Sequence, residues 1–289
     1  MTAEGATDPG AQDDSPVRLR RLLPPGERVA VAEVVEQLGL WDRPPEPAAR
    51  QRVLLNMVST VDGRATLGGR SAPLSGRADR QMFHGLRSAA DAVLVGAGTV
   101  RMERYGRLVK EASVRRLRLE RGLDEEPLAC IVSGRLALEP DIPLLADPAA
   151  RVVIVTSSAA SLPATAAEVE YVRSEREGRV DLAAALAELR SRFGVQVLLC
   201  EGGPHLGQEL FAAGLVDELF LSVSPRLAGG EAASGESLRI LAGPELEPPT
   251  SLEVLGVLEC ESDLFLRYGV CDRASAALPS GADTDDPGA

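Results

Sequence analysis

The chain of 289 residues is 45% hydrophobic and 26% charged, with a formal net charge of −12 at pH 7. These values are typical of a globular protein with one large or two small domains. The acidic balance and an aromatic content of only 3% disfavour nonspecific binding to DNA or RNA, so we expect no nucleic-acid partner. No apolar run approaches the ~18 residues of a membrane-spanning helix, so we expect no membrane insertion.

The cysteines and histidines disfavour a metal site. The chain has four cysteines and two histidines, which are Cys130, Cys200, Cys260, Cys271, His84 and His205. They form no C-x-x-C pair, and no histidine stands at metal-ligand spacing from a cysteine. Three of the cysteines fall in or beside apolar runs, which predicts free thiols in a reducing cytoplasm. The polar N-terminal sequence MTAEGATDPG is unlike a signal peptide.

The chain divides into polar ends and a folded centre. Residues 1–16 and 272–289 are small, polar and acidic, which predicts disordered tails. Residues 17–51 predict an N-terminal extension with one helix, at about 29–40, followed by the Pro-rich sequence RPPEP. The main domain is expected at 52–271.

Apolar runs alternate with helical periodicity through the main domain. Strands are predicted near 53–58, 91–95, 128–132, 151–155, 169–172, 195–199, 217–224, 252–260 and 263–269. Helices are predicted near 77–88, 97–103, 158–166, 181–192 and 203–213. Strands that alternate with helices pair in parallel, because the helix carries the chain back across the sheet.

The last two strands break this alternation. LEVLGVLECE and LFLRYGV are separated only by a short turn around Ser262 and Asp263, so they must form an antiparallel hairpin. The sequence therefore predicts an α/β fold with a mostly parallel central sheet, helices on both faces and an antiparallel C-terminal hairpin.

The sequence VQVLLCEGGPHLGQELF, at 195–211, contains a first candidate binding turn. An apolar strand ends in Cys200 and Glu201, the pair Gly202–Gly203 follows, and a helical pattern then begins. Free backbone N–H groups and the positive end of a helix dipole at such a turn suit a phosphate. A tight turn also requires glycine for steric reasons alone, so the motif is not specific by itself.

A second glycine turn lies in DAVLVGAGTVRME, at 91–103, where Gly96, Gly98 and Thr99 follow a buried-type strand. It lacks the third glycine and the downstream acid of a Rossmann fingerprint. It is not a P-loop, because the only lysine of the chain, Lys110, follows no glycine loop. Two such turns suit a ligand with two phosphate groups, such as a dinucleotide with an additional 2′-phosphate. From the spacing alone, two ordinary strand–helix turns remain an equal alternative.

Three sequence blocks together resemble the pyrimidine reductases of riboflavin biosynthesis. They are NMVSTVDGRATLGGRS at 56–71, DAVLVGAGTV at 91–100 and CEGGPHLGQELFAAGLVDELFLSVSPRLAGG at 200–230, in the family's order. The resemblance covers about residues 52–270 and implies the dihydrofolate reductase-like fold, NADPH as hydride donor, a small-molecule substrate and a homodimer. The implied reaction reduces 5-amino-6-(5-phosphoribosylamino)uracil to its ribitylamino product.

The resemblance assigns the cofactor site to the two glycine turns. Gly96, Gly98, Thr99 and Val100 would hold the adenosine-side phosphates, and NADPH specificity predicts Arg101 or the Thr99 hydroxyl near the 2′-phosphate. Gly202 and Gly203 would hold the pyrophosphate. Glu201 would lie near the nicotinamide and the substrate as a catalytic residue, and the helix after the glycine pair would add Pro204, His205 and Leu206.

The resemblance also implies a substrate pocket lined by Asn56, Ser59 and Asp62. Asp79 stands where folate reductases carry the acid that recognises a pyrimidine or pterin edge, and a carboxylate can accept two hydrogen bonds from such an edge. Partial burial would raise the pKa of Asp79 and let it assist proton delivery. The alternative for Asp79 is a solvent-facing acid in the first turn of a helix.

For Asp62 we favour a structural role in the turn VDG, with substrate contact secondary. Arginines near these acids are candidates for contacts to a substrate phosphate, namely Arg64, Arg77, Arg80 and Arg87. His84 is expected at a helix surface or core edge. His205 follows the glycine pair, where approach to the cofactor and exposure to solvent are both compatible with the sequence.

Two departures from the family pattern leave the identity of the substrate undecided at the level of sequence. The H-x-E and P-C-x-x-C elements of the zinc deaminase that often precedes this domain are missing. The family's acidic Asn/Asp-Pro loop is replaced by TVRMERYGRLV, with Glu103, Arg104 and Tyr105. The alternatives to the riboflavin-type reaction are reduction of a dihydrofolate or dihydropterin, and a non-catalytic NADPH-binding sensor or partner subunit.

Overall fold

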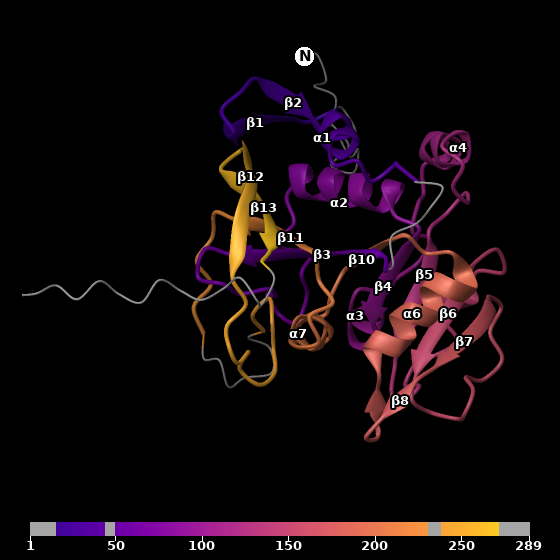
Figure 1. Cartoon of the computed structure of the whole chain (residues 1–289). Helices are drawn as coiled ribbons and strands as arrows, with labels where there is room; N and C mark the ends of the chain where they lie inside the picture. The colour runs from indigo at the N-terminus through magenta and orange to yellow at the C-terminus, as the bar shows by residue number, and fades with distance from the viewer. Residues whose placement is uncertain (1–15, 44–49, 231–237, 272–289) are drawn as a thin grey trace, which may run out of the picture.

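The computed structural model of the chain describes residues 16–43, 50–230 and 238–271. Its centre is an 11-stranded sheet with the order β2-β1-β12-β13-β11-β3-β10-β4-β5-β6-β7 (Figure 1). The tails predicted at 1–16 and 272–289 lie outside the described residues, apart from position 16.

One part of the sheet is parallel, as the alternation of strands and helices predicts. Its strands are β3 (Arg52–Thr60), β10 (Val197–Cys200), β4 (Ala92–Gly96), β5 (Leu128–Val132), β6 (Arg151–Thr156) and β7 (Glu168–Arg173). β11 (Glu218–Ser224) joins the other side of β3, also in parallel. The carboxyl ends of β3, β10 and β4 therefore lie side by side at one edge of the sheet.

The other part of the sheet is antiparallel. β12 (Leu252–Cys260) and β13 (Asp263–Val270) form the predicted C-terminal hairpin, and β13 pairs with β11. β1 (Arg18–Leu23) and β2 (Arg28–Ala30) extend the sheet beyond β12. The prediction of a mostly parallel sheet with an antiparallel hairpin is confirmed.

Helices cover both faces of the sheet, as predicted. One face carries α1 (Val31–Gln37), α2 (Arg77–Ala89), α3 (Ala97–Met102) and α5 (Pro143–Ala146), whose apolar residues share one core cluster. The other face carries α6 (Leu182–Phe193) and α7 (Pro204–Ala212), which belong to a second cluster. α4 (Ala112–Glu120) packs beside α2.

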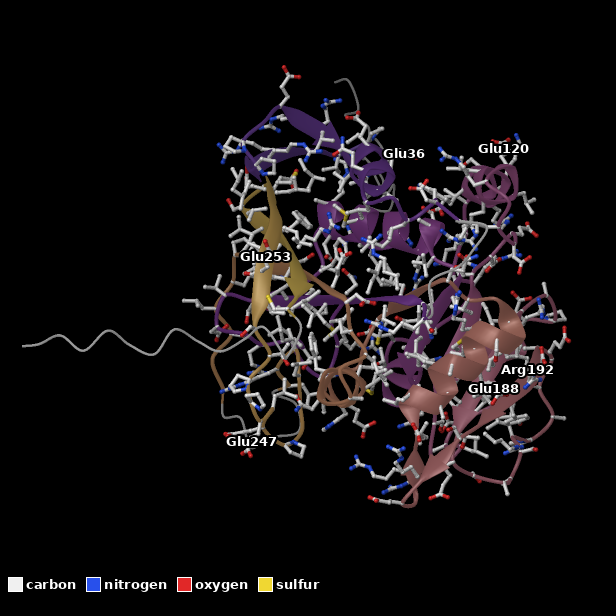
Figure 2. The ribbon with its side chains drawn as sticks, viewed as in Figure 1. Glu36, Glu120, Glu188, Arg192, Glu247 and Glu253 are labelled. Atoms are coloured by element: carbon white, nitrogen blue, oxygen red, sulfur yellow. The ribbon has the colours of Figure 1, made fainter. Side chains whose placement is uncertain are left out.

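α6 has the start, stop and periodicity signals that its sequence predicts. The Asp181 carboxylate accepts a hydrogen bond from the Ala184 N–H at the N-terminus, and Gly194 ends the helix in the left-handed conformation. Glu188 and Arg192, one turn apart, form an ion pair on its outer side (Figure 2). The buried positions Leu182, Leu186 and Leu189 face the sheet, so capping, charge and periodicity all agree.

One predicted helix is wrong. Residues 158–166 form an irregular loop between β6 and β7. Side-chain oxygens bind the local backbone there: Thr156 Oγ1 accepts from the Ser158 N–H, Ser158 Oγ accepts from the Ala160 N–H, and the Thr165 hydroxyl donates to the Ala167 carbonyl. Such bonds compete with helix formation, and they explain why the apolar spacing of this segment misled the prediction.

The N-terminal extension contains more structure than the single predicted helix. α1 confirms a helix within 29–40, but β1 and β2 were not predicted. The structure also adds α4, α5 and a small hairpin of β8 (Glu175–Arg176) and β9 (Arg179–Val180). Among the described residues, no helix is long and apolar enough to cross a membrane.

Candidate active site

A cavity of about 640 Å³ opens at the carboxyl ends of β3, β4 and β10. Walls come from α2, α3, the loop after α3 and the start of α7. The predicted site residues that line it are Asn56, Asp79, Arg80, Gly96, Gly98, Thr99, Arg101, Glu201, Gly203, Pro204, His205 and Leu206. Ligand sites in open α/β sheets form where strands end in this way.

The two glycine turns meet at this edge, although they are about a hundred residues apart in the sequence. The Gly96 N–H donates to the Gly202 carbonyl at 2.9 Å. A Cβ on Gly203 would lie 2.7 Å from Thr99 Oγ1, so a larger residue there would require the Thr99 side chain to move. A Cβ on Gly98 would meet no atom within 4 Å, so its exposed backbone borders open space. The peptide bond between Gly202 and Gly203 is cis.

Glu201 is held by two partners at the end of β10. Its Oε1 and Oε2 accept from Arg87 Nε at 2.6 Å and from Arg87 Nη2 at 2.7 Å. The Tyr105 hydroxyl donates to Glu201 Oε2 at 2.7 Å. The Glu201 side chain is only 1% exposed, so this geometry compensates a buried charge with a bidentate arginine.

Arg87 lies between two aromatic rings. Its Cζ is 4.1 Å from the centre of the Phe83 ring and 5.3 Å from that of Tyr105. Burial opposes the charge, but Glu201 outweighs it and raises the pKa of Arg87 above its usual value. Burial and the charge of Glu201 both raise the pKa of Tyr105, which stays a neutral hydrogen-bond donor. The buried Arg87–Glu201 ion pair thus forms part of the cavity wall.

Asp79 lies in the first turn of α2 and faces inward. It is 7% exposed, and burial raises the pKa of its carboxyl above 3.8, while hydrogen bonds from Ser222 and Ser75 oppose that rise. Burial raises the pKa of Asp263, the first residue of β13, and the nearby charge of Asp79 raises it further. The solvent-facing alternative for Asp79 does not hold, because the carboxyl is buried and lines the cavity.

Asp62 lies outside the cavity lining. Its carboxylate accepts hydrogen bonds from Thr60 Oγ1 and from the N–H groups of Ala228 at 3.2 Å and Gly229 at 2.6 Å. These bonds, that of Thr60 first, lower the pKa of Asp62 to about 2. The side chain ties the turn after β3 to the loop after β11, in keeping with the structural role favoured from the motif VDG.

Several other predicted residues also lie outside the lining, namely Ser59, Arg64, Arg77, Val100 and Gly202. Ser59 and Val100 are buried, and Arg64 binds the Gly229 carbonyl. These residues therefore surround the site but do not line the cavity.

The arginines of the cavity differ in how they are held. Arg80 Nη1 donates to the Ser75 carbonyl at 2.8 Å, and Arg101 Nη1 donates to the Ala137 carbonyl at 2.5 Å. Arg87, considered for a phosphate contact, is instead fully engaged with Glu201 and the Leu108 carbonyl. His84 is half-buried at the wall, and burial followed by Arg87 lowers its pKa. His205 is exposed at the rim.

The loop after α3 contributes residues that the sequence did not single out as ligands. Glu103 accepts from the N–H and hydroxyl of Ser71, at 2.8 and 2.9 Å, and so joins this loop to the first signature. Tyr105 reaches Glu201, as described above. Arg107 and Lys110 add positive charge to the lining. The sequence contains one signal for these contacts, because the segment TVRMERYGRLV stands in place of the Asn/Asp-Pro loop expected from the family resemblance.

Cations are concentrated in this cavity although the chain is acidic. Arg80, Arg87, Arg101, Arg104, Arg107 and Lys110 line it, against Asp79, Glu103 and Glu201. Glutamates such as Glu36, Glu120, Glu247 and Glu253 are exposed on the surface, away from the cavity lining (Figure 2). Local positive potential suits a phosphorylated ligand despite the net charge. The described residues contain no group of acids, cysteines and histidines that could hold a metal ion.

Comparison with known proteins agrees with this architecture. The family model described as the RibD C-terminal domain matches residues 51–265. A 2,5-diamino-6-ribosylamino-4(3H)-pyrimidinone 5′-phosphate reductase of Methanothermobacter thermautotrophicus is 29% identical over 230 residues, 76% of this chain and 99% of that protein. The reductase of the same name from Archaeoglobus fulgidus is 32% identical over 183 residues, 63% of this chain and 83% of that protein.

Solved structures show the same fold. A pyrimidine reductase-like protein from Corynebacterium diphtheriae superposes with a TM-score of 0.65 at 21% identity, over 84% of this chain and all of that one. The family match covers well over half of the sequence and includes both glycine turns and Asp79. The chain therefore belongs to the RibD C-terminal domain family and is an oxidoreductase of the riboflavin-biosynthesis type.

Proposed function

We propose that the chain uses NADPH to reduce a 6-(5-phosphoribosylamino)pyrimidine to the ribitylamino product. The observation that carries the proposal is the meeting of both glycine turns with Asp79 and Glu201 in one cavity. A dinucleotide requires close approach to backbone, which Gly98 leaves open, and the cavity volume of about 640 Å³ lies in the range of cofactor sites.

The residues divide between the two ligands. The cofactor phosphates would be held by Gly96, Gly98, Thr99 and Gly203. Arg101 lies on α3, the same helix as Gly98 and Thr99, and would bind a 2′-phosphate. Asn56 and Asp79, across the cavity, would hold the pyrimidine ring. NADPH, when bound, supplies a hydride. The protein's task is to align the two ligands and keep water out.

In the reaction, the ribosylamine opens to an imine, the imine carbon accepts the hydride and the imine nitrogen accepts a proton. Asp79 is our candidate to supply or relay that proton, because its carboxyl lines the cavity and burial raises its pKa above the usual value. The Glu201 carboxylate binds both Arg87 and Tyr105, so its role in this proposal is to hold these two side chains in place at the reacting end of the cavity.

The ring of the substrate can be inferred from Asp79. The ring in the relatives' name carries a 2-amino group beside a ring N–H, which is a pair of donors. A uracil presents a carbonyl at position 2, so that edge offers a carboxylate only one donor, the N3–H. We therefore favour the 2,5-diaminopyrimidinone phosphate over the aminouracil phosphate expected from the sequence resemblance.

The test of the cofactor assignment is Gly98→Ala. A methyl group there meets no protein atom, so the variant should fold as well as the parent, while NADPH phosphates would be hindered. Fluorescence titration should show NADPH affinity at least ~10-fold weaker, the size of one lost steric or hydrogen-bond fit. Unchanged affinity would place the cofactor away from α3. Titration with NADH, and with Arg101→Ala, checks the 2′-phosphate contact.

The same preparation separates the substrate hypotheses. Oxidation of NADPH with the ribosylaminopyrimidinone phosphate and none with dihydrofolate supports the proposal. Oxidation with dihydrofolate, blocked by a diaminopyrimidine antifolate, would favour the folate alternative. Tight NADPH binding with no turnover on either substrate would favour a sensor or partner subunit.

We also propose a cytoplasmic homodimer. Leu252 and Val254 are 38% and 43% exposed on β12, and they lie opposite Val270 and Tyr268 on one face of the hairpin. Two copies that meet through this face would cover an apolar surface. The buried free thiols Cys130 and Cys200 suit a reducing compartment. Light scattering should give twice the chain mass, and Val254→Glu should yield monomer.

A further inference from the structure

Residues 17–43, here called the N-terminal brace, pack on the side of α2 that faces away from the cavity. β1 pairs with β12, with Arg20 opposite Glu259, and thereby fixes the brace to the main sheet. The buried side chains of α1 share the core cluster of α2, where Val34 and Val35 join Met82 and Leu86. The family model starts at residue 51, so the brace lies outside the matched region.

α1 approaches α2 at a glycine. A Cβ on Gly85 would lie 3.0 Å from Cγ1 of Val31 and 3.0 Å from Cγ2 of Val35. The valine methyl groups therefore rest directly on the backbone of α2, and their size sets the distance between the two helices. Packed interfaces of this kind transmit displacement, because protein interiors have few voids to absorb it.

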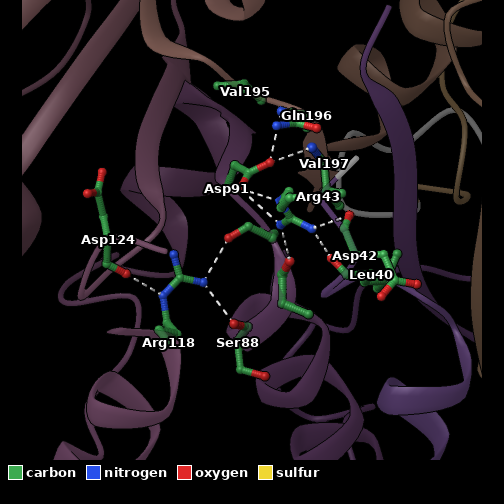
Figure 3. Close-up of polar contacts among 12 residues, drawn as sticks. Leu40, Asp42, Arg43, Ser88, Asp91, Arg118, Asp124, Val195, Gln196 and Val197 are labelled. Carbon is green, nitrogen blue, oxygen red and sulfur yellow. Dashed lines mark hydrogen bonds and ion pairs between the residues drawn. The ribbon is translucent and has the colours of Figure 1, made fainter. Parts of the chain in front are cut away.

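The brace also holds both ends of α2 through polar contacts. Near the start of α2, the Val17 N–H donates to Gln81 Oε1 at 2.9 Å. At the end of α2, Arg43 Nη2 donates to the Ala89 carbonyl at 2.9 Å, and Arg43 Nε donates to Asp91 Oδ1 at 3.0 Å (Figure 3). Asp91 Oδ2 accepts from the Val197 N–H at 2.7 Å, which connects the same cluster to the first residue of β10.

The opposite side of α2 is the cavity wall. Asp79, Phe83 and Arg87 line the cavity, and Arg87 binds Glu201 at the end of β10. The brace contacts α2 directly and is connected to the start of β10 through Asp91, whereas the Arg87–Glu201 pair joins the cavity-facing ends of α2 and β10. One rigid helix thus separates the brace from the groups that would contact the ligands.

We propose that the N-terminal brace is a positioning element of the active site. Through Val31, Val35 and Arg43 it fixes where α2 places Asp79 and Arg87 relative to β10. The catalytic readout below rests on the proposed reductase function, but the spectroscopic readout does not.

The experiment compares Gly85→Ala alone, Gly85→Ala with Val35→Ala, and Gly85→Ala with Val34→Ala. The new methyl at residue 85 meets the methyl groups of both Val31 and Val35, so it forces α1 and α2 apart, and Val35→Ala removes one of these two contacts. Val34→Ala is the matched control, because it removes the same atoms from the same helix and does not contact Gly85.

The first readout is the imidazole resonance of His84 in the protein without ligands. His84 lies on the cavity side of α2 with its ring 5.5 Å from that of Phe83, and His205 is the only other histidine. We expect Gly85→Ala to shift the His84 resonance and its titration midpoint. In the double variants, Val35→Ala should move both part of the way back to the parent values, because the Val31 contact remains, and Val34→Ala should move neither. Val35→Ala truncates a second core side chain and should lower stability further. A His84 signal that nevertheless moves back towards that of the parent would therefore report the position of α2 and not the stability of the fold.

The second readout is turnover. We expect kcat of Gly85→Ala to fall by about tenfold, since sub-ångström misplacement at a reacting site is costly, and to recover in part with Val35→Ala but not with Val34→Ala. An unchanged His84 resonance in Gly85→Ala, or an equal effect of Val34→Ala and Val35→Ala in the double variants, would overturn the proposal.

A parent protein without turnover would contradict the reductase function, while the comparison of His84 resonances would still decide the role of the brace. If Gly85→Ala does not fold, Arg43→Gln provides the same two readouts, and no shift of His84 in that variant would also overturn the proposal.

Discussion

At the scale of single residues, the site depends on charges that compensate one another over long sequence distances. Arg87 and Glu201 are 114 positions apart, and Tyr105 is 96 positions from Glu201. The glycine turns were predictable because each is a local motif with a steric cause. The Arg87–Glu201–Tyr105 cluster was not, because nothing local in the sequence connects the three residues. The sequence analysis named Arg87 as a candidate for binding a substrate phosphate. Its guanidinium is instead occupied by the Glu201 carboxylate.

Tyr105→Phe tests this cluster. The variant removes one of the hydrogen bonds to a buried carboxylate and keeps the ring against Arg87. Bonds to charged groups contribute about 1.5–3 kcal/mol, so we expect the free energy of unfolding in urea to fall by about 2 kcal/mol. Tyr268→Phe is the control, because the structure gives the Tyr268 hydroxyl no hydrogen bond to any residue it describes. Equal losses in the two variants would contradict the account.

Asp62 gives a prediction with a defined pH window. Its pKa is lowered from 3.8 to about 2 in the folded chain, so its stabilising effect is present above pH 3.8 and is lost as the pH falls towards 2. Asp62→Asn should therefore be less stable than the parent at pH 7, and the two should converge near pH 2. Urea unfolding across this range measures the difference. A gap that does not change with pH would show that the carboxylate charge is not the cause.

At the scale of elements, the sequence was informative where local signals agreed. α6 was predictable from its cap, its periodicity and its final glycine. The segment 158–166 has apolar spacing too, but its serine and threonine side chains bind their own backbone. β1 was missed because RLRRLL lacks the alternation of a half-buried strand, and it becomes a strand through pairing with β12. That partner is more than two hundred residues away, so tertiary contact decides the structure.

The C-terminus of α2 provides the prediction at this scale. Arg118, which is 1% exposed, donates to the carbonyls of Ser88 and Ala90 at 2.8 Å each and to that of Asp124 at 2.9 Å (Figure 3). Arg118→Met would leave buried carbonyls without donors, and we expect a loss of at least about 3 kcal/mol in urea unfolding. Arg116→Met, exposed on the same helix, should change stability by less than about 0.5 kcal/mol. A small loss for Arg118→Met would contradict this view of how α2 is anchored.

At the scale of the whole molecule, net charge and fold say less about function than the position of the cavity. The chain carries −12 overall, yet arginines gather where the parallel strands end. Strand order was predictable in outline, because alternation requires parallel pairing and a short turn requires a hairpin. The identity of the cavity walls was not, since α2, α3 and α7 meet only through the three-dimensional arrangement of the sheet.

The most direct test of the central claim is a reaction of the full chain with NADPH and the 2,5-diamino-6-(5-phosphoribosylamino)pyrimidinone, followed by nicotinamide absorbance and by mass analysis of the product. The account predicts oxidation of one NADPH for each product molecule, which is heavier by a hydride and a proton, and loss of this reaction in Asp79→Asn. NADPH that remains reduced in the presence of this substrate, or a product formed at the same rate by Asp79→Asn, would contradict it.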